Sequence, residues 1–361
     1  MVPGMRIDVV GGGIFGVTAA LELRRRGHEV ELWDPSPPHP DASSTDISKV
    51  IRMDYGADRF WMTLMERALP LWEAWNQRFS RPLYHPEGFL ILSPDMAPGG
   101  FEAESMRLLG ERGHAVSPFQ EHPVWRGWKG YLNPHGGWAE SARVVEEVLG
   151  WALDAGVVLH RERADLAALD AEVVVVAAGA WTPSLVPESR HLLRSVGQPV
   201  LHFAPPDPER WRAPRFPTWA ADIGRTGWYG FAANADGLLK IANHGVGVET
   251  DPSGPRLLPE GTHERFRAFL RQHLPELAEL PVVGERLCLY CDAVDSDLLI
   301  DFVPRSHRMV VASGGSGHGF KFAPVLGPLV ADCVEGRKNP WLPRLRWRWP
   351  KQRRFEQARN A

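Results

Sequence analysis

The chain has 361 residues, of which 44% are hydrophobic and 24% charged, and its formal net charge is −3. These values are ordinary for a soluble globular enzyme of two closely packed domains, and they give no reason to expect nucleic acid as a partner. Three cysteines imply no disulfide framework, and no apolar run reaches the roughly eighteen residues of a membrane span. We expect a cytoplasmic monomer or small homo-oligomer without a signal peptide or a membrane partner.

The first strong pattern is a strand, a glycine-rich turn, a helix and a second strand within residues 5–34. The turn carries G-x-G-x-x-G on Gly11, Gly13 and Gly16, the fingerprint of a dinucleotide site. These glycines permit a tight turn and a close approach of the pyrophosphate, which the helix N-terminus attracts. Asp34, twenty-three residues after Gly11, is placed to accept hydrogen bonds from the adenosine ribose. The fingerprint alone does not separate FAD from NAD(P), although an acid at this position argues against a 2′-phosphate.

The next hundred residues mix predicted elements with irregular segments. The patterns predict a Pro- and Ser-rich loop at 35–44, followed by a segment of hydroxyls, cations and apolar residues at 44–55. They then predict a helix at 58–79, a strand at 89–93, a second helix at 101–113 and an irregular aromatic segment at 125–138. Pro70 should kink the first of these helices. Its tryptophans recur at helical spacing, and we interpret them as core residues rather than as a cofactor-binding motif.

Residues 173–181 follow a predicted helix (140–154) and a short strand (157–160), and they read as a fully apolar strand that ends in small residues. A strand buried on both faces belongs in the middle of a parallel sheet. Its small last residues would let a ligand approach the backbone. The segment is therefore either a second contact with the dinucleotide or a plain core strand.

From residue 197 to residue 290 the pattern changes to short alternating segments with clustered prolines. It predicts an antiparallel sheet with strands at 228–232, 238–242 and 286–290, and one inserted helix at 260–273. The chain then returns to a strand, a glycine-rich turn and a helix, at residues 309–312, 313–321 and 325–333. A second turn of this kind suits a long cofactor that is touched at both ends, as FAD would be.

The C-terminal tail from Arg337 contains nine Lys and Arg residues, one Glu and the tryptophans Trp341, Trp347 and Trp349. A basic and aromatic run can bind RNA or a membrane surface. Since no folded nucleic-acid motif accompanies it, we favour a tail that lies across the protein's own acidic surface.

Together these residues resemble the sarcosine oxidase and pipecolate oxidase branch of the D-amino-acid-oxidase-like flavoproteins. The resemblance spans nearly the whole chain, and its most specific pieces are the N-terminal fingerprint, Cys288-Leu289-Tyr290, the strand at 299–301 and the segment 317–321. It implies an α/β fold, with a discontinuous Rossmann-like FAD-binding domain and a mixed or antiparallel substrate domain. The expected boundaries are 1–80, 139–196 and 291–361 (with the basic tail) for the FAD-binding domain, and 81–138 and 197–290 for the substrate domain.

The resemblance implies FAD held covalently, through a thioether between Cys288 and the 8α carbon of the flavin. In a strand Cys288 and Tyr290 share a face and Cys291 points away. The alternative is that Cys288 is a small buried hydrophobe, while a zinc site lacks a second pair of ligands. The expected cofactor-binding residues are Gly11, Gly13, Ile14, Phe15, Gly16, Asp34, Ser44, Thr45, Lys49, Ala178, Gly179, Trp181, Cys288, Gly315, Gly317, His318, Gly319, Phe320 and Lys321.

Two cations, Arg52 and Lys321, match the family's clamp for the substrate carboxylate. An amino acid needs such charge-assisted donors in a partly dry pocket to fix its orientation. Lys240 matches the lysine that lies over the flavin and activates dioxygen, since a cation there stabilises superoxide as it forms. The catalytic residues implied by the resemblance are Lys240, His244, Tyr229 and Tyr290.

Two departures from the family pattern bear on the substrate. Lys49 stands where sarcosine oxidases carry arginine, and the run from Asp46 to Lys49 is more similar to pipecolate, saccharopine and fructosyl-amino-acid oxidases. Asn243 replaces an aromatic residue beside His244. Both departures predict a roomier or more polar pocket than sarcosine requires.

The expected activity is FAD-dependent oxidation of a secondary amino acid, N-substituted or cyclic, by dioxygen to an imine and hydrogen peroxide. The alternatives are a flavin dehydrogenase that passes electrons to a carrier, an oxidase of a primary amine or Amadori-type amino acid, and a catalytically silent flavin-binding protein.

Overall fold

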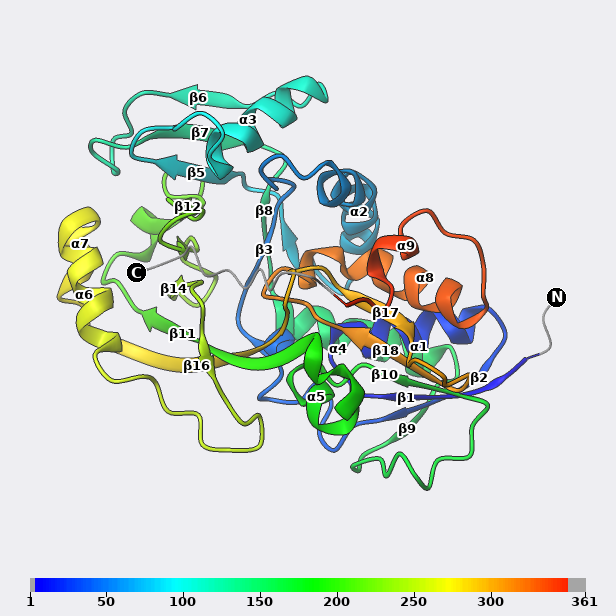
Figure 1. Cartoon of the computed structure of the whole chain (residues 1–361). Helices are drawn as coiled ribbons and strands as arrows, with labels where there is room; N and C mark the ends of the chain where they lie inside the picture. The colour runs from blue at the N-terminus through cyan, green and yellow to red at the C-terminus, as the bar shows by residue number, and fades with distance from the viewer. Residues whose placement is uncertain (1–3, 350–361) are drawn as a thin grey trace.

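A computed structural model describes residues 4–349, and within this range the strands form three sheets (Figure 1). The first sheet is parallel except at one edge, where β17 runs antiparallel to β18. Its strands come from three stretches of the chain that are distant in sequence. Their order across the sheet is β17 (Leu299–Phe302), β18 (Met309–Ser313), β10 (Val173–Val176), β1 (Arg6–Val10), β2 (Glu29–Trp33) and β9 (Val158–His160).

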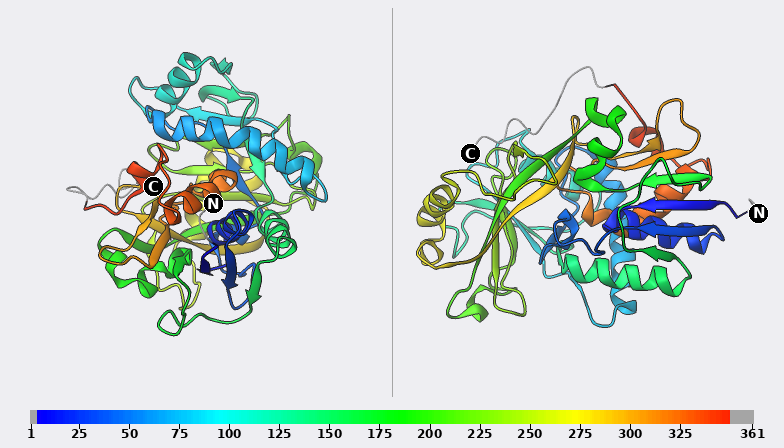
Figure 2. Two further views of the ribbon diagram at one scale, coloured as in Figure 1. Left: turned by 90° about the vertical axis from the view of Figure 1, so that its right-hand side faces the viewer. Right: turned by 90° about the horizontal axis from the view of Figure 1, so that it is seen from below.

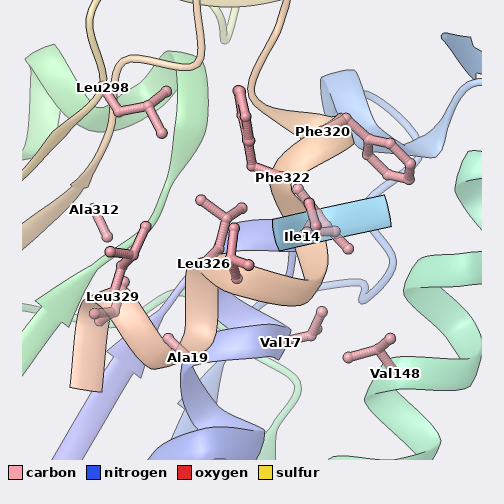
Figure 3. Close-up of a cluster of buried hydrophobic side chains, with 14 of the residues drawn as sticks. Ile14, Val17, Ala19, Val148, Leu298, Ala312, Phe320, Phe322, Leu326 and Leu329 are labelled. Carbon is pink, nitrogen blue, oxygen red and sulfur yellow. The ribbon is translucent and has the colours of Figure 1, made fainter. Parts of the chain in front are cut away.

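Three helices pack together beside this sheet: α1 (Ile14–Arg25), α4 (Ser141–Asp154) and α8 (Ala323–Val334). Figure 3 shows Ile14 and Val17 of α1 beside Leu326 of α8 and Val148 of α4, and all four side chains are buried. The first glycine-rich turn is therefore held from behind by a rigid apolar core.

The second sheet is mixed rather than purely antiparallel, because β5 and β12 run parallel while the other neighbours run antiparallel. In Figures 1 and 2 its long strands β11 and β16 run side by side from this sheet toward the first one. The order is β15 (Val248–Glu249), β11 (Leu193–Phe203), β14 (Leu239–Asn243), β13 (Trp228–Gly230), β12 (Thr218–Ala221), β5 (Phe89–Ser93), β7 (Lys129–Asn133) and β6 (Ser117–Phe119), and β16 (Val282–Ala293) also pairs with β11.

The third sheet is small and joins β3 (Lys49–Ile51), β8 (Gly137–Ala139) and β4 (Tyr84–His85). It lies in the middle of the molecule in Figure 1, between the two large sheets. Sequence patterns did not predict it. It matters for the site because β3 carries Lys49 and leads directly into Arg52.

The remaining helices lie at the periphery of the sheets or connect them. The long helix α2 (Arg59–Arg78) starts where the Asp58 carboxylate accepts hydrogen bonds from the backbone N–H groups of Phe60 and Trp61. The others are α3 (Phe101–Glu111), α5 (Thr182–Leu185), α6 (Thr262–His273), α7 (Pro275–Ala278), α9 (Leu342–Leu345) and the 3₁₀ helices η1 (Ser43–Thr45), η2 (Gly179–Trp181), η3 (Pro187–His191), η4 (Pro208–Trp211) and η5 (Phe320–Phe322).

The fold class expected from the sequence is confirmed, and so are most long elements, α2 and β5 among them. The prediction of an irregular segment at 125–138 was wrong, since it holds β7 and most of β8. The strand predicted over 173–181 ends at Val176, and its last three residues form η2 instead. The sequence patterns did not predict β11, because its C-terminal part lies in the proline-rich stretch. The strand forms because its pairing, in which Pro199 lies opposite Leu287 of β16, overrides local propensity. The residue boundaries of the two domains stay a prediction.

None of the helices within residues 4–349 combines the length and the apolar character that a membrane crossing requires.

Candidate active site

A cavity of about 1370 Å³ of open space lies at the carboxyl ends of the central parallel strands, bordered by Val10, Trp33, Ala177 and Ser313. In a doubly wound α/β sheet this edge is where ligands bind. Both glycine-rich turns line the cavity, although about three hundred residues separate them in sequence. The structure thus brings together the two turns that the sequence suggested as ends of one cofactor.

The N-terminus of α1 opens into this cavity, where Ser44 Oγ accepts a hydrogen bond from Ile14 N at 3.3 Å. Gly13 occupies the N-cap position, and the first turn of the helix contains no acidic residue. A Cβ atom on Gly16 would lie 1.7 Å from the carbonyl oxygen of Gly11, so only glycine allows the helix to approach the turn this closely. The next N–H groups of the first turn and the helix dipole therefore face the position that a pyrophosphate would occupy.

Asp34 lines the same cavity and is fixed by two backbone donors. Its Oδ2 accepts a hydrogen bond from Gly12 N at 2.7 Å, and its Oδ1 accepts one from Ser36 N at 2.9 Å. Each carboxylate oxygen retains acceptor capacity, which is what a ribose diol needs. The residues present therefore fit the adenosine end of FAD.

Most of the expected cofactor residues border the cavity: Gly11, Gly13, Ile14, Phe15, Asp34, Ser44, Lys49, Ala178, Gly179, Trp181, Gly315, Gly317, Gly319 and Phe320. Gly16 lies behind it, and Thr45 instead donates hydrogen bonds from Oγ1 to the carbonyls of His39 and Ala42. His318 and Lys321 line a second cavity, described next, and Cys288 lines neither.

Sequence patterns missed several residues of the first cavity: Trp33, Pro35, His39, Glu162, Arg163 and Ser316. Trp33 could have been found from its place beside Asp34, and Ser316 from its place between glycines. Glu162 and Arg163 lie in a loop without any local signal.

A second cavity, of about 1100 Å³ of open space, adjoins the first and shares Lys49, Tyr290, Gly317 and Phe320 with it. Its walls include strands of the second and third sheets together with α2 and η5. Aromatic and aliphatic side chains form much of the lining, among them Trp61, Phe89, Phe101, Ile223 and Phe231. The two cavities therefore meet at the four residues that they share.

Lys321 is held inside the second cavity by a hydrogen-bonded chain. Its Nζ donates to Tyr55 Oη at 3.1 Å and to the carbonyl of His318 at 3.2 Å. His318 Nε2 lies 2.8 Å from the carbonyl of Ser296, which can only accept, so Nε2 carries a proton. In a neutral ring Nδ1 then accepts the hydrogen bond from Tyr55 Oη at 3.0 Å. These hydrogen bonds fix the position of the Lys321 side chain, and Lys321 is 4% exposed.

Arg52 reaches the same cavity from the end of β3. Its guanidinium lies 5.3 Å from the ring centroid of Tyr55 and 5.5 Å from that of Phe101. Its Nη1 is buried, and within residues 4–349 this atom has no hydrogen-bond partner. A buried guanidinium nitrogen without an acceptor is costly, so the cavity is prepared for an anionic group.

Tyr229 and Tyr290 place their hydroxyl groups 3.3 Å apart in the wall of the second cavity. Burial raises the pKa of Tyr229 to about 12 and raises that of Tyr290 well above its ordinary value, so both phenols stay protonated at neutral pH. The His244 ring lies edge-on to Tyr290, with centroids 5.5 Å apart. Gly317, with a φ of +69°, is required here, because a Cβ atom would lie 2.4 Å from the Tyr290 ring.

Lys240, Cys288 and Asn243 were expected at the flavin or substrate face, and none of them borders either of the two cavities described above. Lys240 is buried behind the Phe231 ring, 4.6 Å from its centroid. Cys288 is fully buried, with its Sγ 3.6 Å from Lys49 Nζ. Asn243 donates from Nδ2 to the carbonyl of Thr226. Of the two departures from the family pattern, only Lys49 therefore reaches the cavities.

Residues 344–348 of the C-terminal segment form ion pairs with acidic residues at the second cavity. Arg344 lines that cavity and pairs with Asp58 at 2.6 Å and Asp297 at 2.8 Å, while Arg348 pairs with Asp295 at 2.5 Å. As far as residue 349, the basic tail thus binds acidic groups of the protein itself. Residues 350–361, which the interpretation of the tail also covered, lie outside the described residues.

The fold and the paired cavities define an oxidoreductase built around a dinucleotide cofactor. The chain belongs to the DAO family of FAD-dependent oxidoreductases, whose family model matches residues 6–333. It is therefore a flavoprotein enzyme that uses FAD.

Two curated relatives match over most of their length. Monomeric sarcosine oxidase from Bacillus sp. (strain B-0618) is 26% identical, with 91% of each chain covered. N-methyl-L-tryptophan oxidase from Yersinia pestis (strain Pestoides F) is 28% identical, with 92% of this chain and 95% of that protein covered.

Solved structures of related fold include fructosamine oxidase (Amadoriase II) from Aspergillus fumigatus, with a TM-score of 0.80, 24% identity, and 96% of this chain and 90% of that chain covered. A thermally stable mutant of fructosyl peptide oxidase gives a TM-score of 0.83 at 22% identity, with 98% and 96% covered. At these identities the likeness concerns the fold.

Proposed function

We propose that this protein oxidises a secondary amino acid, N-substituted or cyclic, with dioxygen as the electron acceptor, and releases an imine and hydrogen peroxide. The observation that carries the proposal is the meeting of the two cavities, with Arg52 and Lys321 in the second one. Two relatives support it, because they are named as oxidases of sarcosine and of N-methyl-L-tryptophan.

The protein's own contribution is to bind and orient the substrate. Arg52 and Lys321 hold the carboxylate, which fixes the carbon next to the amine relative to the place where the cavities meet. Tyr229 and Tyr290, both protonated at neutral pH, offer hydroxyl groups to the amine end. FAD bound in the first cavity supplies the acceptor for the hydride that leaves this carbon.

The lining of the second cavity favours an apolar substituent larger than a methyl group. Trp61, Phe89, Phe101 and Phe231 line the cavity, and a molecule as small as sarcosine has little apolar surface to place against them. Burying such surface contributes about 25 cal/mol per Å². We therefore expect aromatic or cyclic secondary amino acids to be better substrates than sarcosine.

A screen of N-alkylated and cyclic amino acids tests this function. The FAD-loaded protein should release one hydrogen peroxide per substrate oxidised, and a bulky N-methyl amino acid should give a higher kcat/KM than sarcosine. The flavin should be bleached by substrate without air and should regain its colour on mixing with air. Bleaching that persists in air but is reversed by an artificial electron carrier would identify a dehydrogenase instead.

We also propose, from the family resemblance, that Cys288 carries the flavin as a thioether. Lys49 Nζ lies 3.6 Å from the Cys288 Sγ and borders both cavities, so this sulfur is one side chain away from them. Acid precipitation of the wild type should leave the yellow flavin with the denatured chain, and Cys288→Ser should release all of it. Cys291→Ser is the matched control, because Cys291 borders the first cavity from the opposite face of β16. Flavin that stays with the Cys288→Ser chain would contradict this attachment.

A further inference from the structure

A buried cluster of ionisable groups lies behind the cavities, with Asp46 at its centre. Asp46 lies between η1 and β3, and its side chain is 2% exposed. Its Oδ2 is 2.5 Å from Lys240 Nζ of β14 and 3.4 Å from Lys49 Nζ of β3. Its Oδ1 is 3.7 Å from His202 Nε2 of β11. One carboxylate therefore faces two ammonium groups from different sheets, the buried Lys240 and the partly buried Lys49.

The environment of Lys240 makes this carboxylate important. Its side chain is 1% exposed, and an isolated ammonium group at such a place is strongly disfavoured against the neutral amine. Within the described residues its hydrogen bonds go to Asp46 Oδ2 and to the carbonyl of Ser48, at 2.7 Å. The carbonyl contributes a dipole, while Asp46 contributes the full negative charge in contact with the ammonium.

The other ionisable groups around Asp46 and Lys240, within the described residues, are Lys49 of β3, Tyr229 of β13, His202 of β11, and Arg286, Cys288 and Tyr290 of β16. Burial lowers the pKa of Lys240 to about 8, Asp46 opposes that fall, and Lys49 adds to it. The pKa of Asp46 is held well below its usual range: burial alone would raise it, and Lys240 and Lys49 more than reverse that effect. The pair is therefore charged on both sides near neutral pH.

We propose that Asp46 is the positioning residue of Lys240: its carboxylate keeps the buried ammonium charged and fixed, so that oxygen reactivity at neutral pH depends on Asp46. This inference rests on the proposed oxidase function, in which Lys240 stabilises negative charge that develops on dioxygen. Asp46 does not border either cavity, so its effect on the reaction passes through the two lysines that it contacts, and the oxygen half-reaction reports on Lys240.

Lysine NMR can test the inference without turnover, because the chain contains only six lysines. In oxidised holoenzyme labelled with ¹³C at the lysine Cε, Lys240→Met identifies the Lys240 signal. Asp46→Asn removes the charge and keeps the shape. It should move the titration of Lys240 to lower pH by about one to three pH units, the effect of losing a close opposite charge. Asp54→Asn is the matched control, since Asp54 is equally buried and binds Tyr131 and Asn133 instead of Lys240.

Reoxidation of the substrate-reduced enzyme by dioxygen gives the second readout. At pH 8, where wild-type Lys240 is about half charged, Asp46→Asn should slow this reaction by about five- to five-hundred-fold, and the rate should recover as the pH falls. A general structural defect would slow reoxidation at every pH. Asp46→Glu, which restores the charge, should recover part of the rate at pH 8.

Asp46→Asn leaves the buried Lys240 and the partly buried Lys49 without their carboxylate. If it does not fold, Asp46→Asn combined with Lys49→Met removes one of them, and Lys240 should then titrate at lower pH than in Lys49→Met alone. An unchanged Lys240 titration in the foldable variant would overturn the inference. Normal reoxidation at pH 8 in Asp46→Asn, together with slow reoxidation in Lys240→Met, would also overturn it and leave the oxidase function intact. Normal reoxidation in Lys240→Met would instead refute the role of Lys240 on which the inference rests.

Discussion

Replacing either Arg52 or Lys321 with Ala should lower kcat/KM for the amino acid substrate by about thirty- to several-thousand-fold. Removing one partner of a buried, hydrogen-bonded charge pair costs roughly 2–5 kcal/mol, and each 1.4 kcal/mol corresponds to a factor of ten. Within residues 4–349 the buried Nη1 of Arg52 has no acceptor, and Lys321 is 4% exposed, so a substrate carboxylate would meet both cations out of water. Steady-state kinetics of the two variants measure the effect.

The decarboxylated amine shows whether the lost energy belongs to the carboxylate. Wild type should strongly prefer the acid, and the preference should collapse in either variant. The double variant should lose less than the sum of the two single losses, because both cations serve one group. Arg107→Ala, an exposed change on α3 outside both cavities, should leave kcat/KM unaltered. Equal turnover of amine and acid by the wild type would refute the clamp.

The second large effect concerns oxygen. Lys240→Met keeps the length of the side chain and removes its charge, so reoxidation of the reduced flavin by dioxygen should slow by orders of magnitude, about tenfold for each 1.4 kcal/mol of lost transition-state stabilisation. Because burial lowers the pKa of Lys240 to about 8, the charged form prevails below pH 8. The wild-type rate of reoxidation should therefore fall as the pH rises through 8, and the Lys240→Met rate should lack this step. Stopped-flow mixing of reduced enzyme with oxygen measures both.

Reduction of the flavin by substrate separates this role from substrate binding. It should change far less than reoxidation in Lys240→Met, because Lys240 does not border the substrate cavity. Lys129→Met, an exposed lysine on β7, should behave as wild type in both half-reactions. Equal slowing of reduction and reoxidation would contradict a role of Lys240 in the oxygen reaction alone and would indicate that it acts on the substrate.

The FAD-binding half of the protein could be predicted from the sequence because its signals are local. A strand, three glycines in fixed spacing, a helix and an acid determine the geometry of one turn, whatever lies elsewhere. The second turn is equally local, and both line one cavity. Recognition of Arg52, Lys321, Tyr229 and His244 came from the resemblance, and the structure collects all four around the second cavity.

The tertiary structure alone decided which side chains meet. The small sheet of β3, β4 and β8 sets the direction from which Lys49 and Arg52 enter, and its strands of two or three residues are too short for a periodic pattern. Lys240 and Asp46 lie 194 residues apart in sequence. Their ion pair depends on the register of β14 against β11 and on the path of the loop before β3. Local residue propensities determine neither of these. The sequence by itself therefore determined the cofactor class and the two turns that hold the cofactor. Long-range packing determined the buried charge pair, since burial and contact between distant residues exist only in the folded chain.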